Sequence, residues 1–247
     1  MIRAASHRDN RGGIGHARVL WKDAMFEFGH VTHPGLKRQF NEDAYAVDAA
    51  AGVFVVVDGM GGPGHGEAVA AVARDETLRA ARLGMPLDEA VRSAAAVVAR
   101  HLAQHPAAHP AGAALAVLRL AEPDFELAWV GDCSILFGGS DAAQVAAAAA
   151  LPCSGEDAAH RPAATALLGL GASDALRIGL RKGKLRHPVA ILLCSDGVIE
   201  ASTPQARQQA LIRHDLSAQE SVEHLLLDAL AHHARDNLTA ILVRLRH

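Results

Sequence analysis

The order of the apolar segments is the feature that most constrains the fold of this chain. Several strand-like stretches come first, then two helical patterns in a row, then more strands, one further helix and a closing strand. Parallel sheets are built from a regular alternation of strand and helix, and this order does not follow that alternation. We therefore expect the α+β class, with antiparallel sheets whose outer faces are covered by helices.

The individual elements follow from hydrophobic periodicity. Residues 53–57, Val-Phe-Val-Val-Val, are continuously apolar and predict a strand that is buried on both faces. Further strands are predicted at residues 26–31, 44–47, 114–120, 125–130, 189–194 and 239–245, and helices at 65–83, 86–101 and 220–234. Residues 1–24 show no apolar periodicity. We expect them to form a flexible N-terminal extension, followed by a single domain over residues 25–247.

Composition excludes several classes of function. The 247 residues are 50% hydrophobic, which suffices for a large core, and the formal net charge of −3 offers no basic face for nucleic acid or for a membrane surface. No apolar run is long enough to span a bilayer, and the N-terminus lacks the core of a signal peptide. Three scattered cysteines fit a reducing compartment. We expect a cytoplasmic monomer.

Carboxylates follow three of the predicted strands. Asp58 ends the 53–57 strand, Asp132 follows the 125–130 strand, and Asp196 follows the 189–194 strand. Asp236-Asn237 and Asn41-Glu42-Asp43, which precede two other predicted strands, could join them. One Asp-Gly pair is a common turn, and five unrelated turns are the plain alternative. Three such endings suggest instead that carboxylates converge at one rim of a sheet, and a buried cluster of this kind needs a compensating cation. Oxygen ligands without a His or Cys set select Mg²⁺ or Mn²⁺.

Five motifs in order resemble a known family. They are Gly-Leu-Lys-Arg-Gln-Phe-Asn-Glu-Asp at 35–43, Val-Asp-Gly-Met-Gly-Gly at 57–62, Val-Gly-Asp at 130–132, Leu-Cys-Ser-Asp-Gly at 193–197 and Asp-Asn-Leu-Thr at 236–239. Together they resemble the bacterial metal-dependent serine/threonine protein phosphatases of type 2C (the PPM family), over residues 27–245. The resemblance implies a four-layer α-β-β-α sandwich, in which two antiparallel sheets are flanked by helices and a metal centre lies at one end.

The resemblance also implies a role for each motif residue. Asp58 would bridge two Mn²⁺ or Mg²⁺ ions, the carbonyl of Gly59 would hold the first, and Asp196 and Asp236 the second. Asp132 with Asp196 matches the position of a third ion that bacterial relatives often carry. Glu42, Asp43 and Asn237 would lie just outside the metal ligands, where Glu42 and Asp43 orient metal-bound water. Arg38 would bind the substrate phosphate, for which its planar, permanently charged group is suited.

The implied function is hydrolysis of phosphoserine and phosphothreonine in proteins by metal-activated water, opposing a bacterial serine/threonine kinase. The alternative is a catalytically silent phosphoprotein-binding module on the same fold. A third possibility is a phosphatase that acts on one anti-sigma-factor antagonist. It would use the same chemistry and differ only in its substrate protein. No covalent nucleophile is needed, so Cys194 and Ser195 are interpreted as a buried strand end.

Two departures from the family pattern and one nearby histidine bear on the chemistry. Met60 occupies the place of a histidine that many eukaryotic members use, which leaves the proton donor open. His65 is interpreted as a residue that starts a helix. The segment at 138–162, which corresponds to a flap beside the active site, looks short and puts substrate selection in doubt.

Overall fold

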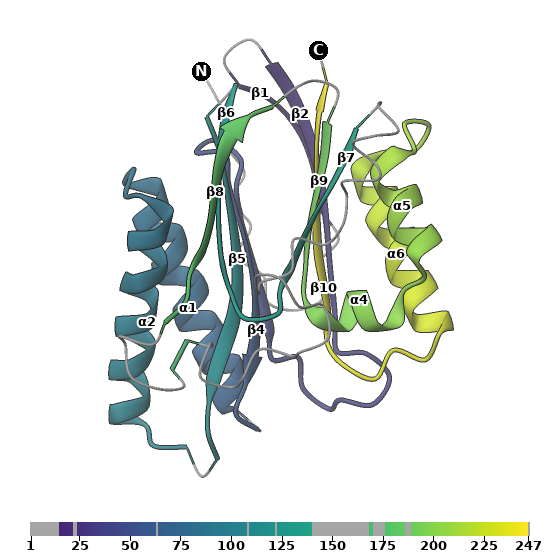
Figure 1. The fold of residues 1–247 in the computed structure, drawn as a ribbon. Helices are drawn as coiled ribbons and strands as arrows, with labels where there is room; N and C mark the ends of the chain where they lie inside the picture. Colours follow the sequence, from purple (N-terminus) through teal and green to yellow (C-terminus); the bar gives the residue numbers. More distant parts are fainter. Residues whose placement is uncertain are drawn as a thin grey trace.

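The computed structural model describes residues 15–21, 24–62, 64–107, 109–121, 123–139, 168–169, 176–185 and 189–246. The strands form two five-stranded antiparallel sheets, with the orders β1-β2-β10-β9-β7 and β3-β4-β5-β6-β8. Figure 1 shows the sheets face to face, with α1 and α2 outside one and α4, α5 and α6 on the side of the other. The predicted α+β class and the four-layer sandwich are confirmed.

The first sheet contains β1 (Gly15–Trp21), β2 (Ala24–His33), β7 (Ser134–Gly139), β9 (Val189–Cys194) and β10 (Leu238–Arg246). The second contains β3 (Asp43–Asp48), β4 (Val53–Met60), β5 (Gly112–Ala121), β6 (Asp124–Val130) and β8 (Gly179–Lys184). The helices are α1 (His65–Arg82), α2 (Leu87–Gln104), α4 (Asp196–Ala201), α5 (Pro204–Ile212) and α6 (Ala218–Ala231).

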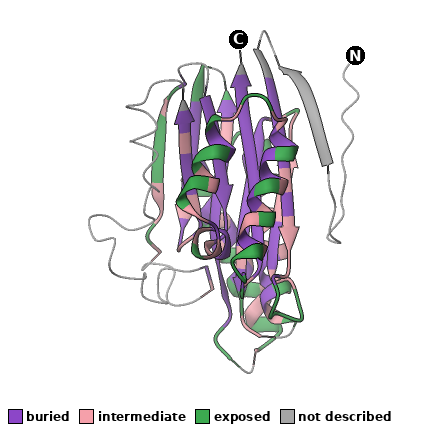
Figure 2. Ribbon diagram, turned by 90° about the vertical axis from the view of Figure 1, so that its right-hand side faces the viewer, coloured by how far each residue is buried: buried purple, intermediate pink, exposed green. Residues whose placement is uncertain are grey.

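Strand β4 shows why the middle of the molecule is so apolar. Phe54 and Val56 pack in the core between the two sheets, whereas Val53, Val55 and Val57 pack against α1 and α2. Successive side chains of a strand point to opposite faces, so a strand covered on both sides must be apolar throughout. A third apolar cluster fills the space between β9, β10 and α6, and Figure 2 shows the exposed outer faces of the helices over these buried strands.

The chain start differs from the prediction. Residues 15–21, which the sequence placed in the N-terminal extension, form β1 and pair with β2 in antiparallel register from Gly15–His30 to Trp21–Ala24. The extension as predicted therefore ends too late, because strand pairing at a sheet edge does not require an apolar pattern of its own. Residues 1–14 lie outside the described residues.

Further elements escaped sequence analysis. The strands β7 and β8 and the short helices α4 and α5 were not predicted. Most of the predicted flap at 138–162 lies outside the described residues, as does Cys153. Among the described helices, none is long and apolar enough to cross a membrane.

Candidate metal centre

Three strand-end carboxylates meet at one end of the sandwich. Asp58, Asp132 and Asp196 each offer a carboxylate oxygen, and these oxygens lie within 4.8 Å of one another. The sheet register explains part of this convergence. Asp58 pairs with Ala114 of β5, and the next residue of β5, Leu115, pairs with Val130 near the end of β6. The predicted convergence of these three carboxylates is confirmed.

The three carboxyls of the cluster lie close enough together to oppose one another's ionisation. The pKa of Asp58 is raised well above its usual value, first by burial and then by the charges of Asp43, Asp196 and Asp132. Burial and the neighbouring Asp132 raise the pKa of Asp196 to about 6. Carboxylates so close together cannot all ionise cheaply unless a cation is present. The donor set consists of hard oxygens, so these residues fit Mg²⁺ or Mn²⁺.

Two carboxylate oxygens beside the cluster point to the same conclusion. Glu42 Oε1 and Asp43 Oδ1 are buried and have no hydrogen-bond partner among the described residues. Burial raises the pKa of Asp43 to about 7 and also raises that of Glu42. A buried polar atom without a partner is costly and calls for an unseen one. The structure thus places Glu42 and Asp43 beside the three-carboxylate group, each with a buried oxygen that no described residue satisfies.

Ser195 has a structural contact that accounts for its burial. Its hydroxyl donates to Asp43 Oδ2 at 2.9 Å and accepts from the backbone N–H of Thr239 at 3.0 Å. The backbone N–H of Ser195 donates to the Thr239 carbonyl at 3.0 Å. Ser195 therefore ties the end of β9 to β10 and holds Asp43, and both Ser195 and Cys194 are buried as the sequence indicated.

Asp236 stands apart from the three-carboxylate group. Its Oδ2 accepts from Arg38 Nη2 at 2.8 Å, and its Oδ1 accepts from the backbone N–H of Asn237 at 2.9 Å. It is still near enough for its charge to raise the pKa of Asp196 and Glu42. The hydrogen bond to Asp236 raises the pKa of Arg38, whose side chain is 53% exposed. The sequence did not predict this ion pair.

Asn237 fixes the loop that carries Arg38 and Glu42. Its side-chain oxygen accepts from the Glu42 N–H at 2.8 Å, and its side-chain nitrogen donates to the carbonyls of Pro34 and Phe40 at 3.0 Å each. Gly35 adopts a φ of +76°, and a Cβ there would lie 2.1 Å from the Asp236 carbonyl oxygen. The loop is thus held against the segment before β10, which positions Arg38 at the rim of the cluster.

Glycines let α1 approach the carboxylates. A Cβ on Gly59 would lie 2.3 Å from the Gly66 carbonyl oxygen, and one on Gly66 would lie 2.6 Å from Glu42 Cδ. The nearby Gly66 backbone partly offsets the effect of burial, which raises the pKa of Glu42. Sequence analysis missed Gly66, although a glycine in the first turn of a helix beside a glycine loop is a signal of close packing. His65 is the first residue of α1, as interpreted.

Two stacked sheets flanked by helices, with a carboxylate cluster at one end, are typical of metal-dependent phosphatases. Comparisons with known proteins point to the same class. The family model of Stage II sporulation protein E (SpoIIE) matches residues 50–246, so the chain belongs to this family, which resembles the type 2C phosphatases. Arg38, Glu42 and Asp43 precede the matched residues. A search of curated proteins with this sequence found no match.

Solved structures share the fold at low sequence identity. The catalytic domain of the serine/threonine protein phosphatase PstP, solved with two manganese ions, has a TM-score of 0.73 at 21% identity, covering 90% of this chain and 99% of that one. PppA, described as a key regulatory component of the T6SS in Pseudomonas aeruginosa, has a TM-score of 0.70 at 22% identity, covering 89% and 97%. The PPM phosphatase MsPP from Mycobacterium smegmatis has a TM-score of 0.67 at 22% identity, covering 87% and 97%. The chain therefore has the fold of bacterial PPM phosphatases.

Proposed function

We propose that this protein is a Mn²⁺- or Mg²⁺-dependent phosphatase that hydrolyses phosphoserine and phosphothreonine in proteins. The observation that carries the proposal is the group of Asp58, Asp132 and Asp196, whose carboxylate oxygens lie within 4.8 Å of one another, with the pKa of Asp58 raised by burial and by the neighbouring charges. The SpoIIE family match and the manganese bound to PstP support the same chemistry.

The residues of the site would have two kinds of role, as metal ligands and as groups that orient metal-bound water. Asp58, Asp132 and Asp196 would hold the ions, with Asp236 and the Gly59 carbonyl as the further ligands that the resemblance implies. Divalent ions supply a nucleophilic water and offset the charge of the transferred phosphoryl group. Glu42 and Asp43 would accept hydrogen bonds from metal-bound water and orient it, because their buried oxygens point to missing partners.

Arg38 would bind the phosphate. Its guanidinium is half exposed, lies at the rim of the cluster, and is held there by a loop that Asn237 fixes. A planar guanidinium gives two parallel hydrogen bonds to phosphate oxygens. Because Asp236 accepts one hydrogen bond from Arg38, the same contact also orients the guanidinium toward the carboxylates.

The cellular setting extends this proposal. We place the protein in the cytoplasm as a monomer, acting on proteins phosphorylated by a bacterial serine/threonine kinase. The number of ions in use would be two, with Asp132 and Asp196 able to hold a third.

The experiment is hydrolysis of a phosphothreonine peptide with added Mn²⁺, repeated after chelation. We expect turnover that depends on the metal and returns when Mn²⁺ is restored. Undiminished turnover after thorough chelation would contradict the proposal. No turnover with Mn²⁺ or with Mg²⁺ would favour the alternative, a catalytically silent phosphoprotein-binding module.

A further inference from the structure

Exposed apolar side chains occur on the loop that carries Arg38 and at the adjoining end of β4. Among the described residues, seven large hydrophobic side chains are exposed. Three of them belong to the two segments that form the rim of the metal centre: Leu36 is 56% exposed, Phe40 is 51% exposed and Met60 is 39% exposed. The other four lie outside these segments, namely Leu83, Leu180, Ile212 and Leu227.

The loop backbone is fixed although these side chains are in solvent. The Leu36 N–H donates to the Ala234 carbonyl at 2.9 Å, and the Phe40 carbonyl accepts from Asn237 at 3.0 Å. Leu36 and Phe40 therefore stand on an anchored segment, two residues before and two residues after Arg38. Backbone contacts hold this loop, so the folded chain itself does not require apolar side chains at either position.

Met60 extends the same rim from a different strand. It directly follows Gly59, whose N–H donates to the Glu42 carbonyl at 3.2 Å, and Glu42 lies two residues after Phe40. This hydrogen bond joins the end of β4 to the Arg38 loop. Apolar side chains thus come from both segments that border the phosphate-binding position.

We propose that Leu36, Phe40 and Met60 form a binding surface for apolar side chains that flank the phosphorylated residue of a protein substrate. The proposal rests on the proposed function, because Arg38 is taken to hold the phosphate. A phosphate bound there places the neighbouring substrate residues over the anchored loop, where Leu36 and Phe40 offer apolar area on either side. The surface would border the proposed phosphate position, and its substrate is a phosphosegment with hydrophobic neighbours rather than one with polar neighbours.

The test uses two phosphothreonine peptides of equal length and charge. One has Leu and Phe beside the phosphothreonine, and the other has Ser and Gln. We expect kcat/KM to be about tenfold higher for the apolar peptide, which is the usual discrimination available from burying a few methylene groups. The double variant Leu36→Ser/Phe40→Ser should reduce this preference to less than about twofold, while hydrolysis of para-nitrophenyl phosphate, which has no flanking residues, stays near the wild-type rate.

The matched control is Leu83→Ser. Leu83 is 72% exposed and follows the 18-residue helix α1, so the length of this helix, about 27 Å, separates it from the first residue of α1, which lies on the side of Glu42. This variant should keep the full preference. Circular dichroism melting of all variants checks that they are folded, and the single variants Leu36→Ser and Phe40→Ser should each lose part of the preference.

Binding of the same peptides, labelled for fluorescence anisotropy, separates this proposal from the function on which it rests. Equal kcat/KM and equal affinity for both peptides, or a preference that the double variant retains, would overturn the apolar surface even in an active phosphatase. No hydrolysis of any substrate, combined with tighter binding of the apolar peptide that the double variant loses, would support the surface and contradict the phosphatase.

Discussion

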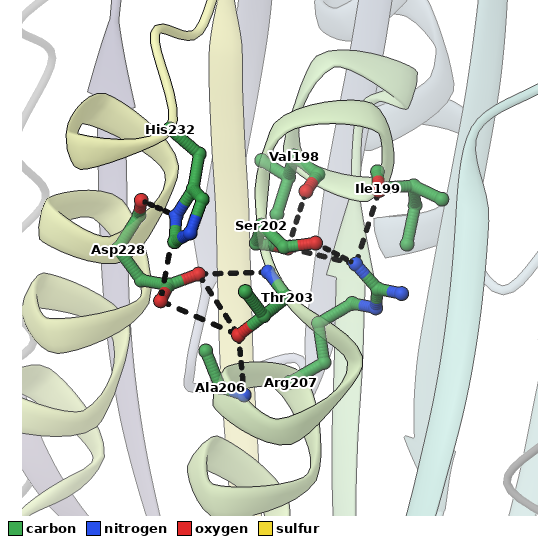
Figure 3. Close-up of polar contacts among 8 residues, drawn as sticks. All are labelled: Val198, Ile199, Ser202, Thr203, Ala206, Arg207, Asp228 and His232. Carbon is green, nitrogen blue, oxygen red and sulfur yellow. Dashed lines mark hydrogen bonds and ion pairs between the residues drawn. The ribbon is translucent and has the colours of Figure 1, made fainter.

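Two polar regions of this molecule differ in how their charges are satisfied. Figure 3 shows the junction of α4, α5 and α6, where the side chains of Thr203, Arg207 and Asp228 all make hydrogen bonds within the chain. Asp228 accepts from the Thr203 N–H at 2.7 Å, and Arg207 donates to the carbonyls of Ile199 and Ser202. At the candidate metal centre, by contrast, the carboxylates of Asp58, Asp132 and Asp196 lie next to one another.

This difference indicates which region stabilises the fold and which region is built to bind a ligand. At the helix junction, donors and acceptors are matched within the chain, so the network serves to join three helices and requires no ligand. At the metal centre, Asp58, Asp132 and Asp196 share one small space, and oxygens of Glu42 and Asp43 lack partners among the residues described. Crowded carboxylates destabilise the ligand-free chain. Such an arrangement is expected where a bound ligand offsets the destabilisation.

The largest effect is expected at the metal centre. Asp58→Asn should reduce phosphopeptide hydrolysis by about 1,000-fold or more, because a central ligand of the proposed ions loses its charge. Asp228→Asn is the matched change in the helix junction and should keep kcat within about twofold of wild type. Steady-state kinetics at saturating Mn²⁺ would compare the kcat values of the two variants. Equal losses of kcat would mean that the two regions do not differ in function.

Arg38 is expected to have the next largest effect. Arg38→Ala should raise KM for a phosphopeptide about 10- to 100-fold, as expected for a charged hydrogen bond worth about 1.5–3 kcal/mol. Arg213→Ala is the control, since Arg213 is also half exposed and paired with an aspartate, Asp215, but lies at the end of α5. An unchanged KM and kcat for Arg38→Ala would show that the motif at 35–43 has been misassigned.

The pH dependence of stability should also distinguish the regions. Burial raises the pKa of Asp43 to about 7 and that of Asp196 to about 6. These carboxyls hold protons in the folded state that they release in the unfolded state, so the stability of the metal-free protein should fall as pH rises from about 4 through 7.

We expect this loss to appear as a fall in the urea midpoint as the pH rises over this range, measured by urea unfolding in the presence of a chelator. Added Mn²⁺ should reverse the loss at pH 7, because a cation favours the ionised carboxylates. A metal-free stability that rises steadily with pH across this window would contradict the proposed charge excess.

The smallest effect is expected at the helix junction. Thr203 caps α5, and its side-chain oxygen accepts from the Ala206 N–H at 3.1 Å. Thr203→Ala should cost about 1 kcal/mol of stability, as the loss of an N-cap usually does, and leave catalysis unchanged. Urea unfolding and phosphopeptide kinetics on one preparation would check both parts, and a large loss of activity would mean that the junction also serves the site.

Sequence patterns predicted the centre of the fold better than its edges. The strand at 53–57 is covered on both faces, so burial alone dictates its residues, and it was found. Strand β8 lies at the edge of its sheet with mostly exposed side chains, Gly-Leu-Arg-Lys-Gly-Lys, and no apolar alternation indicates it. Its formation depends on pairing with β6, which is a tertiary contact that a local pattern does not contain.

The candidate site was predictable for a similar reason. Aspartates at the ends of apolar strands are conspicuous because burial disfavours them, and the structure brings Asp58, Asp132 and Asp196 together. The ion pair of Arg38 with Asp236 and the three hydrogen bonds of the Asn237 side chain join residues about 200 positions apart. Such contacts depend on how loops from different sheets meet, which composition and spacing do not reveal.

Isothermal titration calorimetry with Mn²⁺ tests the central claim most directly, because it counts ions without requiring turnover. We predict that the wild-type protein binds two ions at pH 7, that Asp58→Asn loses this binding, and that Asp228→Asn retains it. Mn²⁺ binding by Asp58→Asn with the stoichiometry and affinity of wild type, or no binding by the folded wild-type protein, would contradict the assignment of a metal centre to this end of the sandwich.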